Sequence, residues 1–352
     1  MRIAILADTH FGARNDSHIF LDHARSFFDG VFFPYLKEHG IKTVIHCGDL
    51  MDRRKYVNFL TLSNVRKHFF EPIIENDIEF HCVVGNHDTF YKNTNELNSS
   101  NELYGSRYDG IKIYQSPTVA SIGGLEFGFV PWICSENEEA CKTFIERGES
   151  QVLIGHFELC GFEVFKGIKH DSGMSHRDLK KYQAVFTGHF HRPQKTDNVQ
   201  YVGSPYQMTF ADVDNERGFW VLDTDDMSTE FIPNPDGLFY QYHYDDTNTD
   251  YQDFLNSDLT VFKGKFVKIY VVAKEKPSVL ESMVFALHDA GVADLKVIEQ
   301  EIQVESSDSG EESDLDRTTL EIICSEVEKS DSPRKEEIMG IIKELYIESM
   351  GQ

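Results

Sequence analysis

Short apolar runs alternate with longer amphipathic stretches along the first two thirds of the chain. Five strand-like runs each lead into a turn that carries Asp, Asn or His, and they occupy residues 3–8, 43–49, 80–88, 151–157 and 184–191. Residues 18–39 and 57–76 place apolar side chains at helical spacing, and the first of these stretches ends at Gly40. Strands that alternate with helices predict an α/β fold.

A different pattern begins after residue 240. Residues 266–273 indicate a strand, a helix opens near Pro277 and runs to Gly291, and a second strand follows over 294–304. Residues 305–316 contain six acidic residues and no basic one, a composition typical of a solvated linker. The sequence therefore predicts an α/β domain at 1–240, a small α+β cap domain at 241–304, an acidic flexible linker at 305–316 and a helical segment at 317–352.

The last segment carries an apolar stripe. Ser332 and Pro333 suit the start of a helix, and the apolar positions i, i+3, i+4 and i+7 are Ile338, Ile341, Ile342 and Leu345. Because the stripe lies behind an acidic linker, it favours a C-terminal helical tail that binds a groove on a partner protein. A helix that packs into this chain's own core is the alternative.

Composition narrows the classes of protein. Apolar residues make up 40% of the chain, yet no apolar run approaches the ~18 residues of a membrane span, and no signal peptide opens the sequence. Six cysteines without a C-x-x-C pair favour reduced thiols and a cytoplasmic protein without a membrane partner. The net charge of −25 argues against nucleic acid. Bound cations could offset part of this charge, so a polyanionic substrate stays compatible.

Polar side chains gather where the predicted strands end. In an open α/β sheet the loops at the carboxyl ends of the strands form the ligand-binding crevice. Carboxylate, imidazole and amide donors in such numbers suit two octahedral divalent ions, with Asp49 as the bridge between them. The candidate metal ligands are Asp8, His10, Asp49, Asn86, His156, His189 and His191.

The five motifs DTH, GDLMD, GNHD, GH and GHFH resemble those of the calcineurin-like metallophosphoesterase superfamily, in the same order. The resemblance implies two packed mixed sheets flanked by helices and a metal-bridging hydroxide that attacks phosphorus. It assigns Asp8, His10, Asp49 and His191 to one ion, and Asp49, Asn86, His156 and His189 to the other. It also implies that His87 donates to the scissile phosphate and that Asp52 orients His87. Some relatives carry His at the position of Asp52. Mn²⁺ is favoured, with Mg²⁺ and Fe²⁺ as alternatives.

The segment QYVGSPYQMTFADVDNERGFWVLD, residues 200–223, is similar to the stretch after the last metal motif in the meiotic-recombination/SbcD family of DNA repair nucleases. That family resemblance implies a DNA-binding cap, double- and single-stranded DNA as substrates, an SMC/SbcC-like ATPase partner and a homodimer. In size the chain resembles the phage members of the family. A phosphoesterase acting on small molecules or phosphoproteins, and a non-catalytic scaffold subunit, are the competing hypotheses.

Basic residues near the motifs could contact DNA phosphates, or could simply form a solvated face. They are Arg53, Arg54, Lys55, Arg177 and Arg192.

Overall fold

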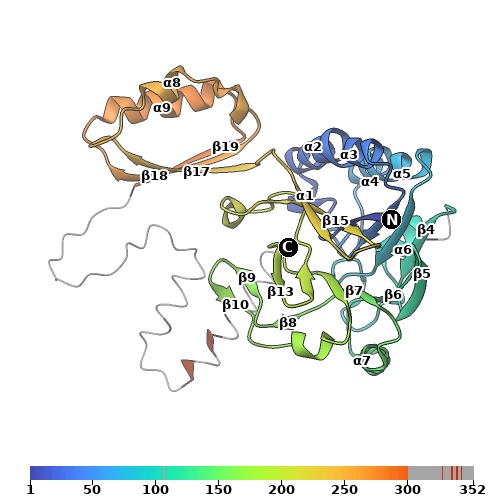
Figure 1. Ribbon diagram of the computed structural model, residues 1–352. Coiled ribbons are helices and arrows are strands. Elements are labelled where there is room, and N and C mark those ends of the chain that lie inside the picture. The colour runs from blue at the N-terminus through green and yellow to red at the C-terminus, as the bar shows by residue number, and fades with distance from the viewer. Residues whose placement is uncertain (106–107, 300–326, 328–333, 336–337, 340–341, 343–352) are drawn as a thin grey trace. The chain divides into compact units, whose positions relative to one another are not determined.

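The computed structural model describes residues 1–105, 108–299, 327, 334–335, 338–339 and 342. The chain divides into two compact units, Met1–Leu238 and a second unit that starts at Phe239, two residues before the predicted start of the cap (Figure 1).

Within the described part of the first unit, two six-stranded mixed sheets provide the framework. In the first sheet β1 to β4 run parallel, and β15 and β16 extend it antiparallel beyond β1. Its order is β16 (Thr229–Pro233), β15 (Gly218–Asp223), β1 (Arg2–Leu6), β2 (Thr43–His46), β3 (Glu79–Val83) and β4 (Ile111–Tyr114).

The second sheet has a parallel centre as well. Strands β6, β7, β12 and β14 run parallel, and the two edge strands pair antiparallel. Its order is β13 (Gln194–Thr196), β14 (Val199–Tyr201), β12 (Ala184–Gly188), β7 (Val152–His156), β6 (Leu125–Val130) and β5 (Thr118–Ile122).

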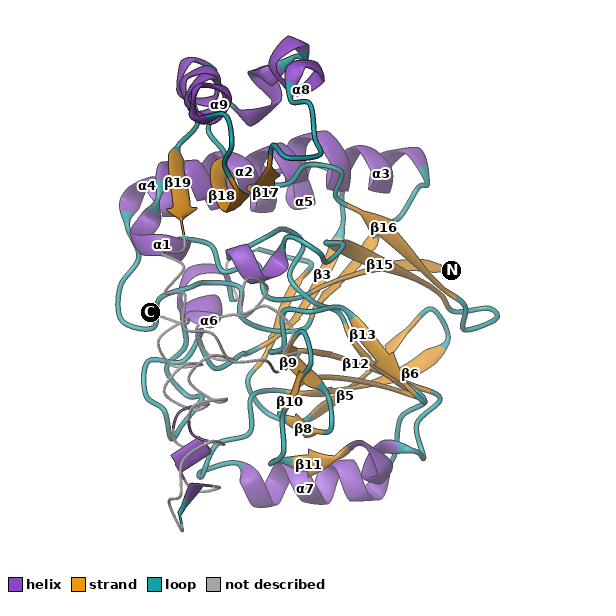
Figure 2. Cartoon of the chain, turned by 90° about the vertical axis from the view of Figure 1, so that its left-hand side faces the viewer, coloured by secondary structure: helices purple, strands orange, loops and turns teal. Residues whose placement is uncertain are grey.

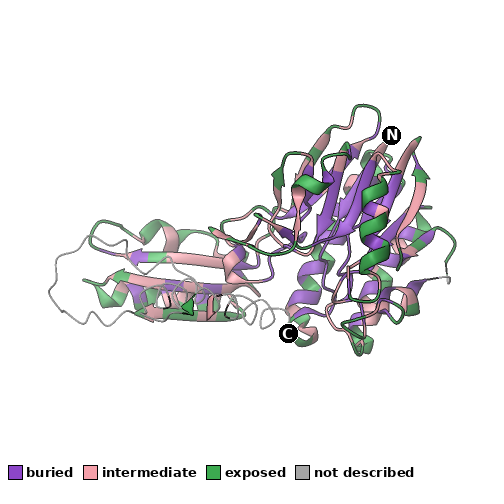
Figure 3. Ribbon diagram, turned by 90° about the horizontal axis from the view of Figure 1, so that it is seen from below, coloured by how far each residue is buried: buried purple, intermediate pink, exposed green. Residues whose placement is uncertain are grey.

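The two sheets pack face to face. Ile5 and Ile45 of the first sheet share one core with Phe129, Ile154 and Phe186 of the second, and all five are fully or almost fully buried (Figure 3). Strands buried on both faces consist mostly of apolar side chains, which explains the nearly continuous apolar runs in the sequence. The predicted pair of packed mixed sheets is confirmed.

Helices cover the outer faces of this sheet pair (Figure 2). Two long helical stretches lie over the first sheet, where aromatic side chains such as Phe28, Phe69 and Phe80 stack edge to face. On the second sheet α7 buries Cys141 and Ile145. The helices of this unit are α1 (Ala13–Asp16), α2 (His18–Phe27), η1 (Phe28–Phe32), α3 (Phe33–Glu38), α4 (Phe59–Val65), η2 (Arg66–Phe70), α5 (Glu71–Glu75), α6 (Ser99–Tyr104) and α7 (Glu138–Arg147).

Both long stretches contain a wider helical turn directly before a proline. The turn η1 joins α2 to α3, which carries Pro34 in its first turn, and η2 joins α4 to α5, which carries Pro72. A proline inside a regular helix would clash with the carbonyl four residues earlier and lacks the N–H that would bond to it. The wider π-type turn lets each helix continue past the proline.

Short elements complete the first unit between β7 and β15. They are β8 (Leu159–Cys160), β9 (Glu163–Phe165), β10 (Ile168–Lys169), β11 (Met174–Ser175), η3 (His176–Leu179) and η4 (Phe210–Asp212).

The second unit has a parallel three-stranded sheet and its own core. Val267, Ile269 and Tyr244 of the sheet pack against Leu280 and Met283 of the main helix. The elements are β17 (Phe239–Asp245), α8 (Gln252–Asn256), η5 (Leu259–Phe262), β18 (Phe266–Ala273), α9 (Pro277–Asp289) and β19 (Asp294–Glu299), with the sheet order β17-β18-β19.

The predicted linker 305–316 lies outside the described residues, and so do Ile341 and Leu345 of the predicted stripe. Ile338 and Ile342 are helical and half-buried, and the Ile338 N–H donates to the Arg334 carbonyl at 3.0 Å. In the described part of the chain, no helix has the length and apolar character needed to cross a membrane.

Candidate metal centre

Five strands from the two sheets deliver the candidate ligands to one place. Asp8 and His10 follow β1, Asp49 follows β2, Asn86 follows β3, His156 ends β7, and His189 and His191 follow β12. The first three strands belong to one sheet and the last two to the other. The candidate ligands therefore lie where the carboxyl ends of both sheets meet.

The loops that hold these residues are joined and strained. The Asp8 N–H donates to the Gly48 carbonyl at 3.0 Å, and the His10 N–H donates to the Asp49 carbonyl at 3.1 Å. Asp8, His10, Asp49 and His189 all have positive φ, from 41° to 92°, a region that non-glycine residues rarely adopt. Such strain is held in place by surrounding structure and is concentrated at functional sites.

Gly85 allows the loops after β2 and β3 to approach closely. A Cβ at this position would collide with the backbone nitrogen and the carboxylate of Asp49. Only glycine fits there, which explains the first residue of the GNHD motif. The Asp88 carboxylate accepts the N–H groups of Gly85 and Met51 at 2.9 and 3.0 Å and fixes the same loop.

Among the described residues, one group of potential metal donors consists of Asp8, His10 and His191, whose donor atoms all lie within 4.8 Å of one another. The Nε2 atoms of the two histidines are 3.0 Å apart. Oδ1 of Asp8 accepts the His189 N–H at 2.9 Å, while Oδ2 is buried and has no hydrogen-bond partner. A buried, unpartnered carboxylate oxygen beside two converging imidazole nitrogens fits a cation, because nothing else there satisfies it.

A second group consists of Asp49, His156 and His189. Nδ1 of His156 donates to the Cys47 carbonyl at 2.8 Å, which fixes Nε2 as the atom that faces the group. The amide oxygen of Asn86 lies 2.9 Å from that Nε2 and 3.0 Å from Nδ1 of His189. Two imidazoles, a carboxylate and an amide oxygen again match the preferences of a divalent ion.

Asp49, which belongs to the second group, also lies next to His10 of the first group. Its Oδ2 is 3.6 Å from Nε2 of His10 and 3.3 Å from Nε2 of His156. Its Oδ1 accepts the His87 N–H at 2.7 Å. One carboxylate with neighbours on both sides is the arrangement that a bridging ligand requires.

A sequence profile described as calcineurin-like phosphoesterase matches residues 1–193, which include every candidate metal ligand. The chain belongs to this family. It is also 32% identical to Exonuclease subunit 1 of Enterobacteria phage T4 over 353 residues, 99% of each chain. Among solved structures, an archaeal phosphodiesterase matches 66% of this chain and 100% of its own, with 16% identity and a TM-score of 0.34. A protein from Aquifex aeolicus matches 45% and 80%, with 15% identity and a TM-score of 0.24.

The predicted family is thus confirmed, and the phosphoesterase donor set implies divalent metal ions.

In the absence of ions, the nearby carboxylates determine the pKa values of two of the histidines. Burial opposes protonation of both rings, yet Asp52 and Asp49 raise the pKa of His10 to about 9, and Asp49 and Asp8 raise that of His156 to about 9. Metal binding to this phosphoesterase at neutral pH would therefore displace protons from these two rings.

The position of Asp52 corrects one expectation. The family resemblance implies that its carboxylate orients His87. In the structure, however, Oδ1 of Asp52 lies 3.2 Å from Nδ1 of His10. His87 is held by the main chain of the same residue, because its Nδ1 donates to the Asp52 carbonyl at 2.8 Å. Burial lowers the pKa of His87, which favours a neutral ring in the resting protein.

Arg217 is a supporting residue of the phosphoesterase site that sequence reasoning missed. This buried side chain donates to the carbonyl of His191 and, at 2.9 Å, to Oγ of Ser204. It also pairs with the buried carboxylate of Asp212, and these contacts fix the loop that carries His191. Arg217 lies within residues 200–223, which stand out in the sequence by their family resemblance. Nothing in that stretch indicates that the side chain of Arg217 is buried.

We expect Arg217→Met to lower the free energy of unfolding by roughly 3–5 kcal/mol, because the substitution leaves the Asp212 carboxylate buried without its partner. Urea denaturation measures this loss. The control is Arg192→Met, which removes a half-exposed arginine 3.4 Å from Glu163 and should cost less than about 1 kcal/mol. Equal losses in both variants would show that Arg217 has no special structural role.

The candidate DNA-contacting residues differ in how exposed they are and in whether other side chains already contact them. Arg53 is half-buried, contacts Asn15 and Tyr56, and lies 3.7 Å from Asp16, so its own loop already engages it. Arg54 is half-exposed, whereas Lys55 is exposed directly after it. Arg177 is exposed in η3, and Arg192 directly follows the last histidine of the GHFH motif.

Two further side chains border the site but belong to none of the five sequence motifs. Glu158 lies 3.3 Å from Nε2 of His189, and the Trp132 ring lies 5.2 Å from the His189 ring. Neither could be found from spacing, because both come from loops whose course depends on the packing of the second sheet.

Proposed function

We propose that this phosphoesterase is a two-metal DNA nuclease that hydrolyses phosphodiester bonds. The observation that carries the proposal is the position of Asp49 between two groups of donors, 3.6 Å from His10 on one side and 3.3 Å from His156 on the other. The substrate class rests on similarity along the whole chain to the phage T4 Exonuclease subunit 1. The name of that relative favours removal of terminal nucleotides.

The proposed ligands divide between two ions that share Asp49. Asp8, His10 and His191 complete the first set, and Asn86, His156 and His189 complete the second. When bound, a pair of divalent ions supplies the hydrolytic nucleophile and offsets the charge of the phosphate. We favour Mn²⁺ over Mg²⁺, because imidazole-rich sites suit Mn²⁺ and Fe²⁺ better than the hard Mg²⁺ ion.

His87 is proposed to act on the leaving group. Its Nδ1–H is engaged by the Asp52 carbonyl, so Nε2 is the atom left to act on the departing oxygen. Because Nε2 is bare in the neutral ring, it would first take up a proton and then give that proton to the departing oxygen. The ring also lies edge-on to His10, with centroids 4.8 Å apart, at the border of the proposed metal centre. Asp52 therefore positions His87 through its main chain rather than through its carboxylate.

The experiment is a comparison of substrates. The purified chain is incubated with Mn²⁺ and linear duplex DNA, single-stranded DNA, a small phosphodiester or a phosphopeptide, with EDTA as the control. We expect cleavage of both DNA forms, abolished by EDTA and much faster than turnover of the small ester or the phosphopeptide. Preference for either of the latter would support the alternative of a non-nuclease phosphoesterase. No hydrolysis of any substrate would support a scaffold subunit.

We also propose that the chain acts with an SMC/SbcC-like ATPase and as a homodimer. The relative's name describes a subunit, and residues 239–299 form a separate unit that we propose as a DNA-binding cap. Exposed apolar side chains on and before α4, with Phe59 87% and Tyr56 61% exposed, support a protein contact on the first unit. Light scattering tests the dimer.

We expect a chain that ends at Asp316 to keep basal Mn²⁺-dependent nuclease activity and to lose the ATPase partner. The reason is that the metal motifs end at His191, whereas the proposed partner-binding residues are Ile338, Ile341, Ile342 and Leu345. A pull-down and ATP-stimulated duplex degradation measure the effect. Unchanged partner affinity in the shortened chain would place the interface elsewhere.

A further inference from the structure

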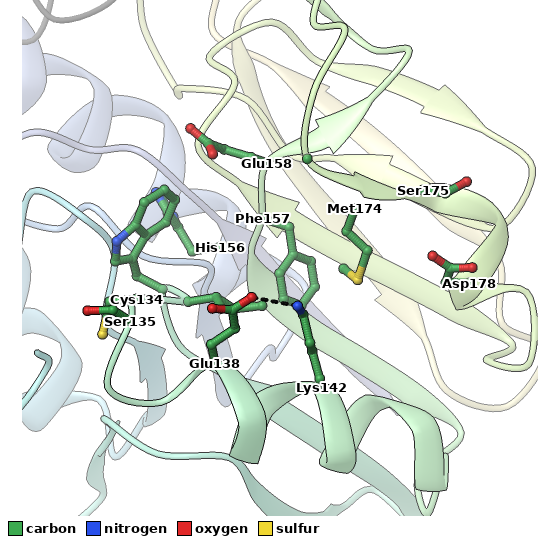
Figure 4. A pocket seen from close by; sticks show the side chains of 13 residues that line it. Cys134, Ser135, Glu138, Lys142, His156, Phe157, Glu158, Met174, Ser175 and Asp178 are labelled. Carbon is green, nitrogen blue, oxygen red and sulfur yellow. Dashed lines mark hydrogen bonds and ion pairs between the residues drawn. The ribbon is translucent and has the colours of Figure 1, made fainter. Parts of the chain in front are cut away.

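A pocket of about 660 Å³ adjoins the second group of donors (Figure 4). His156, a proposed ligand, forms part of its wall, together with Phe157 and Glu158 from the same segment. The opposite sides come from α7 and from the segment around Met174 of β11. The volume is within the range of sites that hold a small molecule, and far larger than a bound phosphate needs.

Trp132 provides an aromatic wall for the pocket and is fixed by its main chain. Its N–H donates to the Val84 carbonyl at 2.7 Å, and its own carbonyl accepts the side-chain amides of Asn95 and Asn137 at 2.8 and 3.0 Å. The half-exposed indole lies 6.0 Å from the His156 ring and 5.2 Å from the His189 ring, measured between centroids. The main chain that carries this ring is thus fixed next to the proposed metal centre.

The charges around the pocket select against an anion. Glu138, Glu158 and Asp178 line it. Glu138 pairs with Lys142, the lysine among the lining residues, at 2.5 Å, and Glu158 lies 3.3 Å from Nε2 of His189. A phosphate group would meet more carboxylates than cations here. Carboxylate oxygens accept hydrogen bonds from exocyclic amino groups, as they do from N4 of cytosine. Together with Phe157 and Met174, which are apolar, the wall suits a flat, uncharged ring with amino groups.

We propose that the pocket receives one unpaired nucleobase of the DNA strand, stacked on Trp132, while the adjacent phosphate lies at the metal centre. This proposal rests on the proposed nuclease function and adds a base-binding subsite to it. Bases with an exocyclic amino group bind more tightly than thymine, because thymine has a carbonyl oxygen at the position where cytosine has an amino group that can donate to the carboxylates. Occupation of the pocket requires an unpaired base, which a strand end supplies more readily than an intact duplex.

Intrinsic fluorescence reports the stacking directly. The chain has two tryptophans, and Trp220→Phe leaves Trp132 as the single one while it preserves an aromatic ring against Phe231. With Mn²⁺ present, dCMP is expected to quench the emission of Trp132, and inorganic phosphate is not. Equal quenching by both compounds, or none by dCMP, would overturn the proposal.

Affinity provides the second test. By calorimetry, Trp132→Ala should bind dCMP about 5- to 150-fold more weakly, the range expected for loss of one base stack, while inorganic phosphate binds as in the wild type. Trp132→Phe should recover most of the affinity. The control is Tyr108→Ala, which removes a 37% exposed aromatic side chain between α6 and β4 and should not change dCMP binding.

The outcomes separate the two proposals. If the wild type degrades DNA but Trp132→Ala binds dCMP as tightly as the wild type, the subsite is wrong and the nuclease stands. If dCMP binds through Trp132 but no DNA is cleaved, the subsite stands and the nuclease function is wrong. Equal affinities of the wild type for dCMP and dTMP would overturn the proposed role of the carboxylates.

Discussion

Asp49→Asn is expected to lose both bound metal ions and to reduce DNA cleavage by more than about 10³-fold. The carboxylate is the only proposed ligand shared by both ions, so its charge stabilises the whole centre rather than half of it. Loss of an outer supporting contact typically costs only 10–100-fold. Metal content after dialysis against Mn²⁺ and the rate of DNA degradation measure the two effects.

The asparagine variant is chosen because it preserves the fold. Oδ1 of Asp49 accepts the His87 N–H at 2.7 Å, and an amide oxygen can accept the same bond. The matched control is Asp225→Asn, which neutralises an aspartate whose side chain is 85% exposed. An Asp49→Asn protein that retains two ions per chain would contradict the assignment of the bridging ligand.

His87→Gln is expected to separate binding from chemistry. Turnover should fall by roughly 10²–10⁴-fold, the usual contribution of a positioned proton donor, while two metal ions and DNA remain bound. The physical reason is that His87 contacts the Asp52 carbonyl and borders the donor groups without being needed to complete either proposed set. Single-turnover cleavage and metal content measure the two properties separately.

The control for this variant is His68→Gln. His68 lies in η2, where its Nδ1 is 2.9 Å from the carboxylate of the exposed residue Asp29. Its substitution should change neither turnover nor metal content. His10, Asp49 and His87 also place donor atoms within 4.8 Å of one another. If His87→Gln loses a metal ion together with its activity, His87 is a ligand and the assignment of a proton donor is wrong.

The convergence of the candidate ligands could be predicted in part, because it depends on the ends of strands. Apolar runs mark β1, β2, β3, β7 and β12, and within each sheet the residues after parallel strands share one edge. Asp8 follows β1 of the first sheet and His191 follows β12 of the second, yet their donor atoms lie within 4.8 Å of each other, because the carboxyl ends of the two packed sheets meet. The local pattern and the tertiary arrangement agree at these positions.

The remaining features depend on side-chain directions within loops, which no periodicity encodes. Asp52 directs its carboxylate to His10 because the loop after β2 brings its carbonyl, not its side chain, to His87. Arg217 turns inward because Asp212 is buried beside it. Trp132 borders the centre only because Val84, Asn95 and Asn137 fix its main chain from three segments. Each of these depends on tertiary contacts.

A crystal of the protein grown with Mn²⁺ and a phosphorothioate oligonucleotide would test the central claim most directly, through the anomalous signal of the metal. We predict two peaks about 3.5–4 Å apart on either side of Asp49, the separation typical of two-metal hydrolases, with the scissile phosphate against both. His10 and His191 should face one peak, and His156 with Asn86 the other. A single peak, or two that do not share Asp49, would contradict the account.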